Sequence, residues 1–166
     1  MKEVFVLLDR CVGCKTCELS CTVEHSMSKS LFTAISETPL PKRRIYVESG
    51  QERKIPITCR HCTEAPCIDT CITGAMHCTP EGVVTNVEGT QKCIGCWMCL
   101  MVCPYGVMGR QVEPRVAVKC DLCPEKETPV CVESCPTKAL VYMEAEEFSR
   151  YLRHKSASTI ATALKG

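Results

Sequence analysis

Residues 93–104, CIGCWMCLMVCP, decide the fold of this chain. Their four cysteines follow the spacing C-x2-C-x2-C-x3-C, and a proline follows the last of them. Three cysteines at i, i+3 and i+6 allow a tight curl of backbone to offer three thiolates to the irons of one 4Fe-4S cluster. The fourth cysteine of such a run ligates the other cluster of a pair. The stretch therefore predicts iron-sulfur ligation and a second cluster close by.

Sixteen of the seventeen cysteines fall into four groups of four. The first group repeats the spacing of residues 93–103, whereas the second and fourth groups have four and seven residues before their third cysteine. A longer loop can still return the third thiolate to its iron, so each group keeps the ligand count of one cluster. The sequence thus predicts four 4Fe-4S clusters. In chain order the groups are Cys11, Cys14, Cys17 and Cys21; Cys59, Cys62, Cys67 and Cys71; Cys93, Cys96, Cys99 and Cys103; and Cys120, Cys123, Cys131 and Cys135.

The distances between groups indicate which of them exchange their last cysteine. The second and third groups lie 22 positions apart, which is close to the compact arrangement of a two-cluster ferredoxin, and the first and fourth groups are then left to pair. Each predicted ligand set is named here by its first group. The sets are the Cys11 set (Cys11, Cys14, Cys17, Cys135), the Cys59 set (Cys59, Cys62, Cys67, Cys103), the Cys93 set (Cys93, Cys96, Cys99, Cys71) and the Cys120 set (Cys120, Cys123, Cys131, Cys21).

An internal repeat follows the last cysteine of three groups. Cys71, Cys103 and Cys135 are each followed, five positions later, by an apolar residue, and two of the three are followed directly by proline. A repeat at irregular intervals indicates duplication of a ferredoxin half-module. The apolar residues are Met76, Met108 and Leu140.

Short elements are expected around the cysteine groups, so the predicted fold class is α+β with two nested ferredoxin-like modules of two clusters each. Residues 1–30 and 110–143 form the predicted outer module, and residues 59–109 form the inner one. Residues 31–58 are an insertion, and residues 144–166 form a helical tail that packs on the cluster domain or docks to a partner. Strands are predicted at 4–8, 44–48, 54–58 and 113–119, and a hairpin at 75–79 and 83–87.

The composition leaves little apolar material for a core. Cysteine makes up 17 of the 166 residues, and there are only three Phe, one Trp and four Tyr. Metal ligation is therefore expected to supply much of the folding free energy. The formal charge of +1 becomes about −7 once sixteen thiolates and four oxidised cluster cores are counted, so nucleic acid is not an expected partner. Six basic residues beside the groups either offset this charge or are simply solvated: Arg10, Lys15, Arg60, Lys92, Lys119 and Lys138.

Other readings of the cysteines fit less well. Structural zinc usually takes two separate C-x2-C pairs, and a radical S-adenosylmethionine site would need a third cysteine where Glu24 stands. No run approaches the roughly 18 apolar residues of a membrane span, and no signal sequence is recognised, which predicts a cytoplasmic location where disulfides are rare. Cys78 is left over and is interpreted as structural, with a ligand or reactive role as the alternative. Trp97 either shields a cluster or packs in the core. The four histidines are assigned surface or packing roles.

The order of the four groups resembles the four-cluster ferredoxin-like electron-transfer subunits of dimethyl sulfoxide reductase, formate dehydrogenase and related complexes, over nearly all of residues 1–143. Within that family, residues 11–21 (CVGCKTCELSC), 23–26 (VEHS), 44–48 (RIYVE) and 59–62 (CRHC) look most like the small iron-sulfur subunit of nickel carbon monoxide dehydrogenase systems. The resemblance implies the same nested pairing. Ile72 and Thr22 replace the proline that follows the last cysteine in the family pattern.

The resemblance also implies a function without a substrate site of its own, in keeping with the lack of a nucleotide fingerprint or a nucleophile-base pair in the sequence. Electrons would pass from a catalytic oxidoreductase subunit, with carbon monoxide dehydrogenase favoured, to a hydrogenase or a flavin-dependent nicotinamide oxidoreductase. A tungsten aldehyde oxidoreductase or a formate dehydrogenase is the alternative partner. A structural or regulatory metal-binding module is the alternative of another class.

Overall fold

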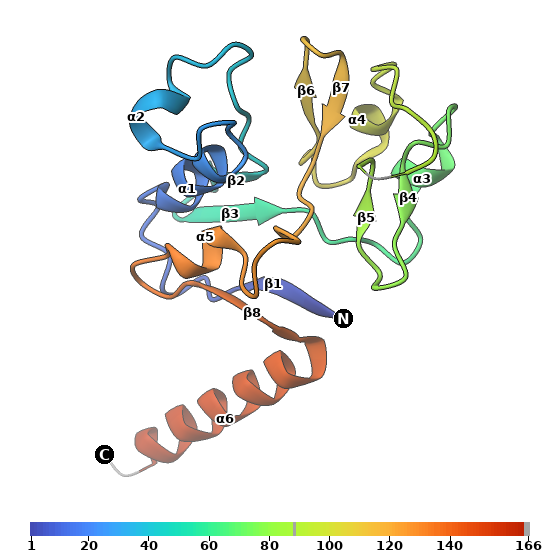
Figure 1. Cartoon of the computed structure of the whole chain (residues 1–166). Helices are drawn as coiled ribbons and strands as arrows, with labels where there is room; N and C mark the ends of the chain where they lie inside the picture. The colour runs from blue at the N-terminus through green and yellow to red at the C-terminus, as the bar shows by residue number, and fades with distance from the viewer. Residues whose placement is uncertain (88, 165–166) are drawn as a thin grey trace.

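Short helices and four separate two-stranded antiparallel sheets make up the computed structural model, which describes residues 1–87 and 89–164. The elements gather into two lobes, with the strand β3 running between them (Figure 1). The outer lobe contains both ends of the cysteine-bearing chain, and the inner lobe contains its middle. The chain is therefore an α+β protein, as the sequence predicts.

The outer lobe is closed by contacts between distant parts of the sequence. The strand β1 (Lys2–Val6) pairs antiparallel with β8 (Leu140–Glu144), and the helix α1 (Thr16–Glu24) contacts α5 (Val130–Glu133). Buried Val4 and Leu140 lie in one apolar cluster with cysteines of the first and last groups. Burial of this shared face draws the two ends of the chain together.

A hairpin from the segment between the first two cysteine groups packs on α1. Its strands are β2 (Ile45–Ser49) and β3 (Lys54–Thr58), and the short helix α2 (Leu31–Ala34) precedes them. Ile45 and Val47 are buried on one face, as period-two alternation requires. The buried carboxylate of Glu18 accepts a hydrogen bond of 2.6 Å from the Val47 amide, which ties the hairpin to α1.

The inner lobe has shorter elements. The helix α3 (Pro66–Asp69) contacts α4 (Met98–Val102), and the strands β4 (His77–Cys78) and β5 (Val84–Thr85) have two residues each. The hairpin of β6 (Gly109–Gln111) and β7 (Val116–Val118) completes it. Ala117 of β7 lies in the same apolar cluster as Met76 and Val84, so the inner lobe extends beyond residue 110.

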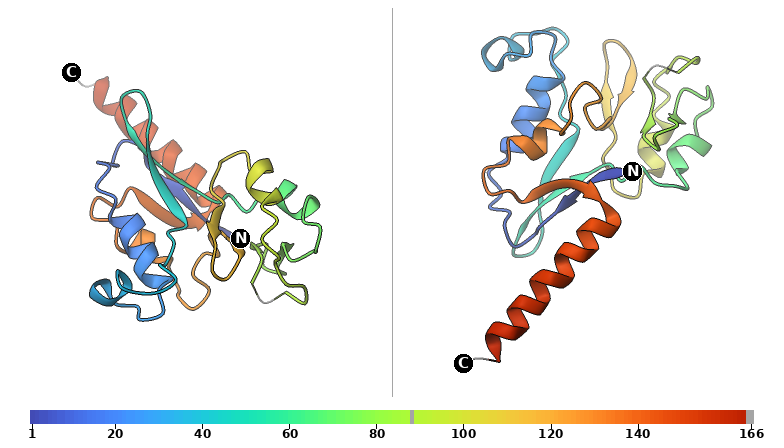
Figure 2. Two further views of the ribbon diagram at one scale, coloured as in Figure 1. Left: turned by 90° about the horizontal axis from the view of Figure 1, so that it is seen from above. Right: turned by 60° about the horizontal axis from the view of Figure 1, so that its bottom comes forward.

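The helix α6 (Ala145–Ala163) leaves the body at the end of β8 and projects from it (Figure 2). Among the described residues, the side-chain contacts between this helix and the body involve the part of the helix up to Lys155. The Phe148 ring stacks on Phe5 with 4.4 Å between centroids, Arg10 donates a hydrogen bond of 2.9 Å to the Tyr151 hydroxyl, and Lys155 pairs with Asp9. Among the described residues, no helix combines the length and apolar character that a membrane span requires.

The predicted elements agree with the observed ones where pairing is local. The strand at 54–58 is confirmed, and the strands at 4–8 and 44–48 are displaced by one or two residues. The tail predicted at 144–166 is helical over Ala145–Ala163, and residues 165 and 166 lie outside the described residues. The hairpin at 75–79 and 83–87 has shorter strands than predicted, and the strand at 113–119 is shortened to Val116–Val118. The strands β6 and β8 were not predicted.

Candidate metal centres

In every cysteine group, the residue just before the second cysteine has a left-handed backbone. These residues are Gly13 (φ 71°), His61 (φ 44°), Gly95 (φ 62°) and Leu122 (φ 62°). A left-handed residue at this position curls the chain, and three of its cysteines can then face a common point. Glycine is required at position 95, because a Cβ there would lie 2.7 Å from the Arg115 carbonyl oxygen.

The third cysteine of each group is the second residue of a short helix. Cys17, Cys67, Cys99 and Cys131 begin α1, α3, α4 and α5 in this way. Burial raises the pKa of the Cys17 and Cys99 thiols to about 11. Since iron binds the thiolate, these buried positions favour deprotonation only when a metal cation is present to compensate the charge.

The last cysteines of the second and fourth groups lie in turns that favour the thiolate. The Sγ of Cys71 accepts a hydrogen bond of 3.4 Å from the Met76 amide, and the Sγ of Cys135 accepts one of 3.2 Å from the Ala139 amide. Burial acts to raise the pKa of Cys135, but hydrogen bonds from the Leu140 amide and the neighbouring threonine hold that pKa below its ordinary value. Hydrogen bonds to a charged form stabilise it.

The internal repeat corresponds to a repeated turn. The third residue after each of these last cysteines has positive φ, and the apolar residue five positions on is buried. The left-handed residues are Gly74, Gly106 and Lys138, and the buried anchors are Met76, Met108 and Leu140. The repeat in the sequence therefore corresponds to a repeated backbone turn, and duplication of a half-module stays a prediction.

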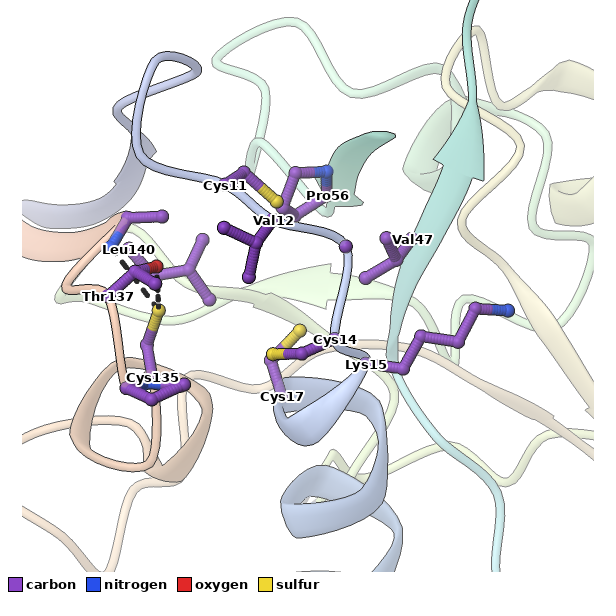
Figure 3. Close-up of a pocket in the computed structure, with 13 residues that line it drawn as sticks. Cys11, Val12, Cys14, Lys15, Cys17, Val47, Pro56, Cys135, Thr137 and Leu140 are labelled. Atoms are coloured by element: carbon purple, nitrogen blue, oxygen red, sulfur yellow. Dashed lines mark hydrogen bonds between the residues drawn. The ribbon is translucent and has the colours of Figure 1, made fainter. Parts of the chain in front are cut away.

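The four cysteines of the Cys11 set line one pocket (Figure 3). Cys11, Cys14 and Cys17 come from the curl that leads into α1, whereas Cys135 approaches from the turn after α5. Val47 and Pro56 of the β2–β3 hairpin line the same pocket. Residues more than a hundred positions apart thus offer four thiols to one space.

The four cysteines of the Cys93 set line a second pocket. Cys93, Cys96 and Cys99 share it with Cys71, and Trp97 and Ala117 complete its lining. The Ala117 amide donates a hydrogen bond of 3.4 Å to the Cys93 Sγ. The lining therefore combines the third group with the last cysteine of the second.

In the other two predicted sets, the negative charge of some thiolates raises the pKa of another thiol of the same set. Burial raises the pKa of Cys131, and negative charge on Cys120, Cys21 and Cys123 raises it further. Burial likewise raises the pKa of Cys67, which also responds to charge on Cys59 and Cys103. Such effects require short distances, so Cys131 lies near Cys21 and Cys120, and Cys67 lies near Cys103. The assignment of these cysteines to two ligand sets stays a prediction.

A polar network supports the loop of the fourth group. Asp121 pairs with Arg44 and accepts a hydrogen bond of 3.1 Å from the Cys123 amide, and its third partner is His25 Nε2 at 3.2 Å. Burial acts to raise the pKa of Asp121, but the hydrogen bond with His25 and the charge of Arg44 hold that pKa well below its ordinary range. The Arg44 amide also donates to the Sγ of Cys21 at 3.3 Å. Nothing in the sequence pattern signalled this network.

The donor chemistry fits 4Fe-4S clusters. Iron-sulfur clusters are held by four cysteine thiolates, and each set consists of four thiols. Five of the sixteen cysteines accept a backbone N–H hydrogen bond at Sγ, from the amides of Arg44, His61, Met76, Ala117 and Ala139. Such hydrogen bonds stabilise thiolate and tune cluster potential.

The remaining candidate residues lie outside the four sets. Cys78 is exposed on β4, and Trp97 is half-buried, with the guanidinium groups of Arg110 and Arg115 at 5.7 and 5.8 Å from its ring centroid. His154 is exposed on α6, whereas His61 is buried. His25, Asp121 and Cys123 place their ligand atoms within 4.8 Å of one another, an arrangement that the Arg44 network accounts for.

Convergent cysteine sets in a two-lobed α+β fold define a class of small proteins built around polynuclear metal centres. Comparison with known families is more specific, because residues 52–145 match the family described as "4Fe-4S dicluster domain". The chain belongs to this family.

Three relatives align with almost the whole chain. It is 38% identical to "Iron-sulfur protein" of Rhodospirillum rubrum, covering 92% of this chain and 87% of the relative. It is 34% identical to "Electron transport protein HydN" of Escherichia coli K12, covering 93% and 96%. It is 36% identical to "Probable anaerobic dimethyl sulfoxide reductase chain YnfG" of the same strain, covering 96% and 79%.

Proposed function

We propose that this protein carries electrons through four 4Fe-4S clusters, held by the Cys11, Cys59, Cys93 and Cys120 sets, between a catalytic oxidoreductase subunit and a downstream acceptor. The observation that carries the proposal is the meeting of Cys135 with the first cysteine group in one pocket. A cysteine borrowed from a distant group is what paired clusters require. The names of HydN and of the R. rubrum relative support the same function.

We infer a spatial order of the four sets from thiols of different sets that act on one another's pKa, and this order would give a path with two ends. Burial is the main cause of the raised pKa of Cys131, Cys120 and Cys99, and each also responds to a cysteine of a neighbouring set. Charge on Cys17 acts on Cys131, charge on Cys59 acts on Cys120, and charge on Cys67 acts on Cys99. The proposed order is therefore the Cys11, Cys120, Cys59 and Cys93 sets.

When bound, the clusters supply one-electron redox chemistry, and the protein holds and insulates them. Cysteine thiols fix each centre, backbone amides stabilise the thiolates, and buried apolar residues such as Met76 and Leu140 exclude water. We propose no substrate site in this chain. A protein of this kind depends on its partners for chemistry.

Quantification of iron and acid-labile sulfide after anaerobic purification tests the cofactor content. We expect about sixteen iron and about sixteen sulfide per chain, since each 4Fe-4S cluster contains four of each. About four iron per chain would reject four clusters. Zinc in place of iron would favour a structural or regulatory metal-binding module.

We propose carbon monoxide dehydrogenase as the catalytic partner, and a hydrogenase or a flavin oxidoreductase as the acceptor. The resemblance of residues 11–21, 23–26 and 44–48 to the small subunit of carbon monoxide dehydrogenase systems supports this choice. Anaerobic co-purification with mass-spectrometric identification of the bound large subunit tests it. Recovery of a formate dehydrogenase, a tungsten aldehyde oxidoreductase or a dimethyl sulfoxide reductase instead would reject this partner and leave the electron-transfer proposal intact.

A further inference from the structure

Of the six basic residues beside the cysteine groups, Lys119 alone is buried. Lys119 is 3% exposed, whereas the other five are exposed on the surface: Arg10, Lys15, Arg60, Lys92 and Lys138. The comparison with Lys92 is the most direct, because each lysine immediately precedes the first cysteine of a group. Sequence position alone therefore does not distinguish a solvated lysine from a buried one.

Within the part of the chain that the structure describes, the ammonium of Lys119 donates hydrogen bonds only to backbone carbonyls. Its acceptors are the carbonyl oxygens of Val84, in the inner lobe, and of Cys120 at 2.9 Å, in the outer lobe. No ion pair of Lys119 is found among residues 1–87 and 89–164. A buried cation is costly unless negative charge compensates it, so an anionic group is expected close by.

Residues of two predicted ligand sets adjoin at this lysine. Val84, whose carbonyl accepts a hydrogen bond from Lys119, lies in the apolar cluster against which Cys62 and Cys67 of the Cys59 set pack. Cys120, the next residue along the chain, belongs to the other set. Lys119 thus lies where the Cys59 and Cys120 sets adjoin.

The neighbouring histidine, His61, is neutral, so Lys119 is the cation at this place. His61 Nδ1 accepts a hydrogen bond of 3.1 Å from the Val84 amide, so this ring is neutral and carries its proton on Nε2. The buried Nε2 atom has no hydrogen-bond partner among the described residues. An acceptor for this N–H is also expected in the junction.

We propose that Lys119 is the shared counter-cation of the clusters held by the Cys59 and Cys120 sets, and that its buried ammonium raises the reduction potentials of both. The proposal rests on the proposed function. Reduction adds one electron to a cluster and makes it more negative, so a nearby cation favours the reduced form. Because the ammonium is shielded from solvent, salt screens this interaction far less than it screens a surface charge.

The test uses Lys119→Met, which keeps the length of the side chain and removes its charge, with Lys92→Met as the matched control. The four midpoint potentials of the anaerobically purified full chain are measured by electron paramagnetic resonance during potentiometric titration. In Lys119→Met we expect two of the four one-electron couples to fall by about 59 mV or more, which corresponds to a tenfold shift toward the oxidised form. In Lys92→Met we expect smaller shifts.

Unchanged midpoints in Lys119→Met, or equal shifts in the two variants, would overturn the role of Lys119. Iron analysis of the same samples separates this failure from failure of the proposed function, because about sixteen iron per chain would still be present. If Lys119→Met and Lys119→Gln do not assemble clusters, Lys119→Arg decides the matter. Assembly and unchanged midpoints in Lys119→Arg support the need for charge, and its failure to assemble overturns the proposal.

Discussion

The two lobes hold equal numbers of cysteine groups, but they differ in what else stabilises them. The outer lobe has two antiparallel sheets, each with two five-residue strands: β1 paired with β8, and β2 paired with β3. The inner lobe has helices of four and five residues and strands of two and three. Both lobes contain a buried apolar cluster, but the shorter strands of the inner lobe indicate that its stability depends more on bound metal than that of the outer lobe.

Removal of iron should separate the lobes most clearly. After anaerobic chelation we expect amides of residues 59–109 to lose nearly all their protection against hydrogen exchange, because two-residue strands bury too little to compensate chain entropy. Amides of β1 and β8 should keep part of theirs. Exchange followed by mass spectrometry on the loaded and metal-free chain measures both regions.

Equal loss of protection in both lobes would contradict the comparison. It would mean that the outer lobe also folds only with its metal, so that cluster assembly and folding are one event for the whole chain.

The proposed exchange of cysteines between groups can be tested at Cys135. In Cys135→Ser we expect loss of about a quarter of the iron, because one of four clusters loses a ligand, and the cluster of Cys11, Cys14 and Cys17 should be the one affected. Iron analysis and electron paramagnetic resonance measure the two effects. Cys78→Ser is the matched control and should keep all of its iron.

Selective loss of the cluster held by Cys120 and Cys123 in Cys135→Ser would overturn the nested pairing. The fourth group would then supply all four ligands to its own cluster.

Replacing a glycine where two backbone segments lie close together in the inner lobe should have a smaller effect on stability. Gly95 and Gly106 both have φ of 62°, but only at Gly95 would a new Cβ meet backbone, at 2.7 Å from the Arg115 carbonyl oxygen. Gly106→Ala should cost about 1 to 2 kcal/mol for the left-handed conformation alone. Gly95→Ala should cost at least about 1 kcal/mol more, because β7 or the curl must shift.

Anaerobic urea denaturation of the two loaded variants measures the difference. Equal urea midpoints for the two variants would show that the backbone around residue 95 shifts at little cost in free energy. The inner lobe would then be the more deformable of the two lobes.

The fold class could be predicted because four groups of closely spaced cysteines indicate iron-sulfur ligation directly, whereas the exchange of last cysteines between groups stays a prediction. Spacing alone was enough to group Cys11, Cys14 and Cys17. The apolar positions Met76 and Leu140 could be recognised because each lies five residues after the last cysteine of a group. The pairing of β8 with β1 could not be predicted, because its partner lies some 140 residues away and no local pattern specifies it.

The buried polar contacts were also missed. Arg44, Asp121 and His25 lie in three separate segments, and nothing in their own neighbourhoods distinguishes them from solvated charges. The same holds for Lys119, whose burial depends on Val84 and on the meeting of the two lobes.

The smallest expected effect concerns how α6 is attached to the outer lobe. Phe148→Ala removes the ring that stacks on Phe5 and should cost about 1 kcal/mol, the usual value of an aromatic pair beyond its area. Ile160→Ala, on the distal and exposed part of α6, should change stability by less than about 0.5 kcal/mol. Urea denaturation of both loaded variants measures the difference. Since Phe5 belongs to β1, a cost in Phe148→Ala should also appear as faster exchange of β1 amides, and unchanged exchange there would place the anchor of α6 at Arg10 and Tyr151 instead.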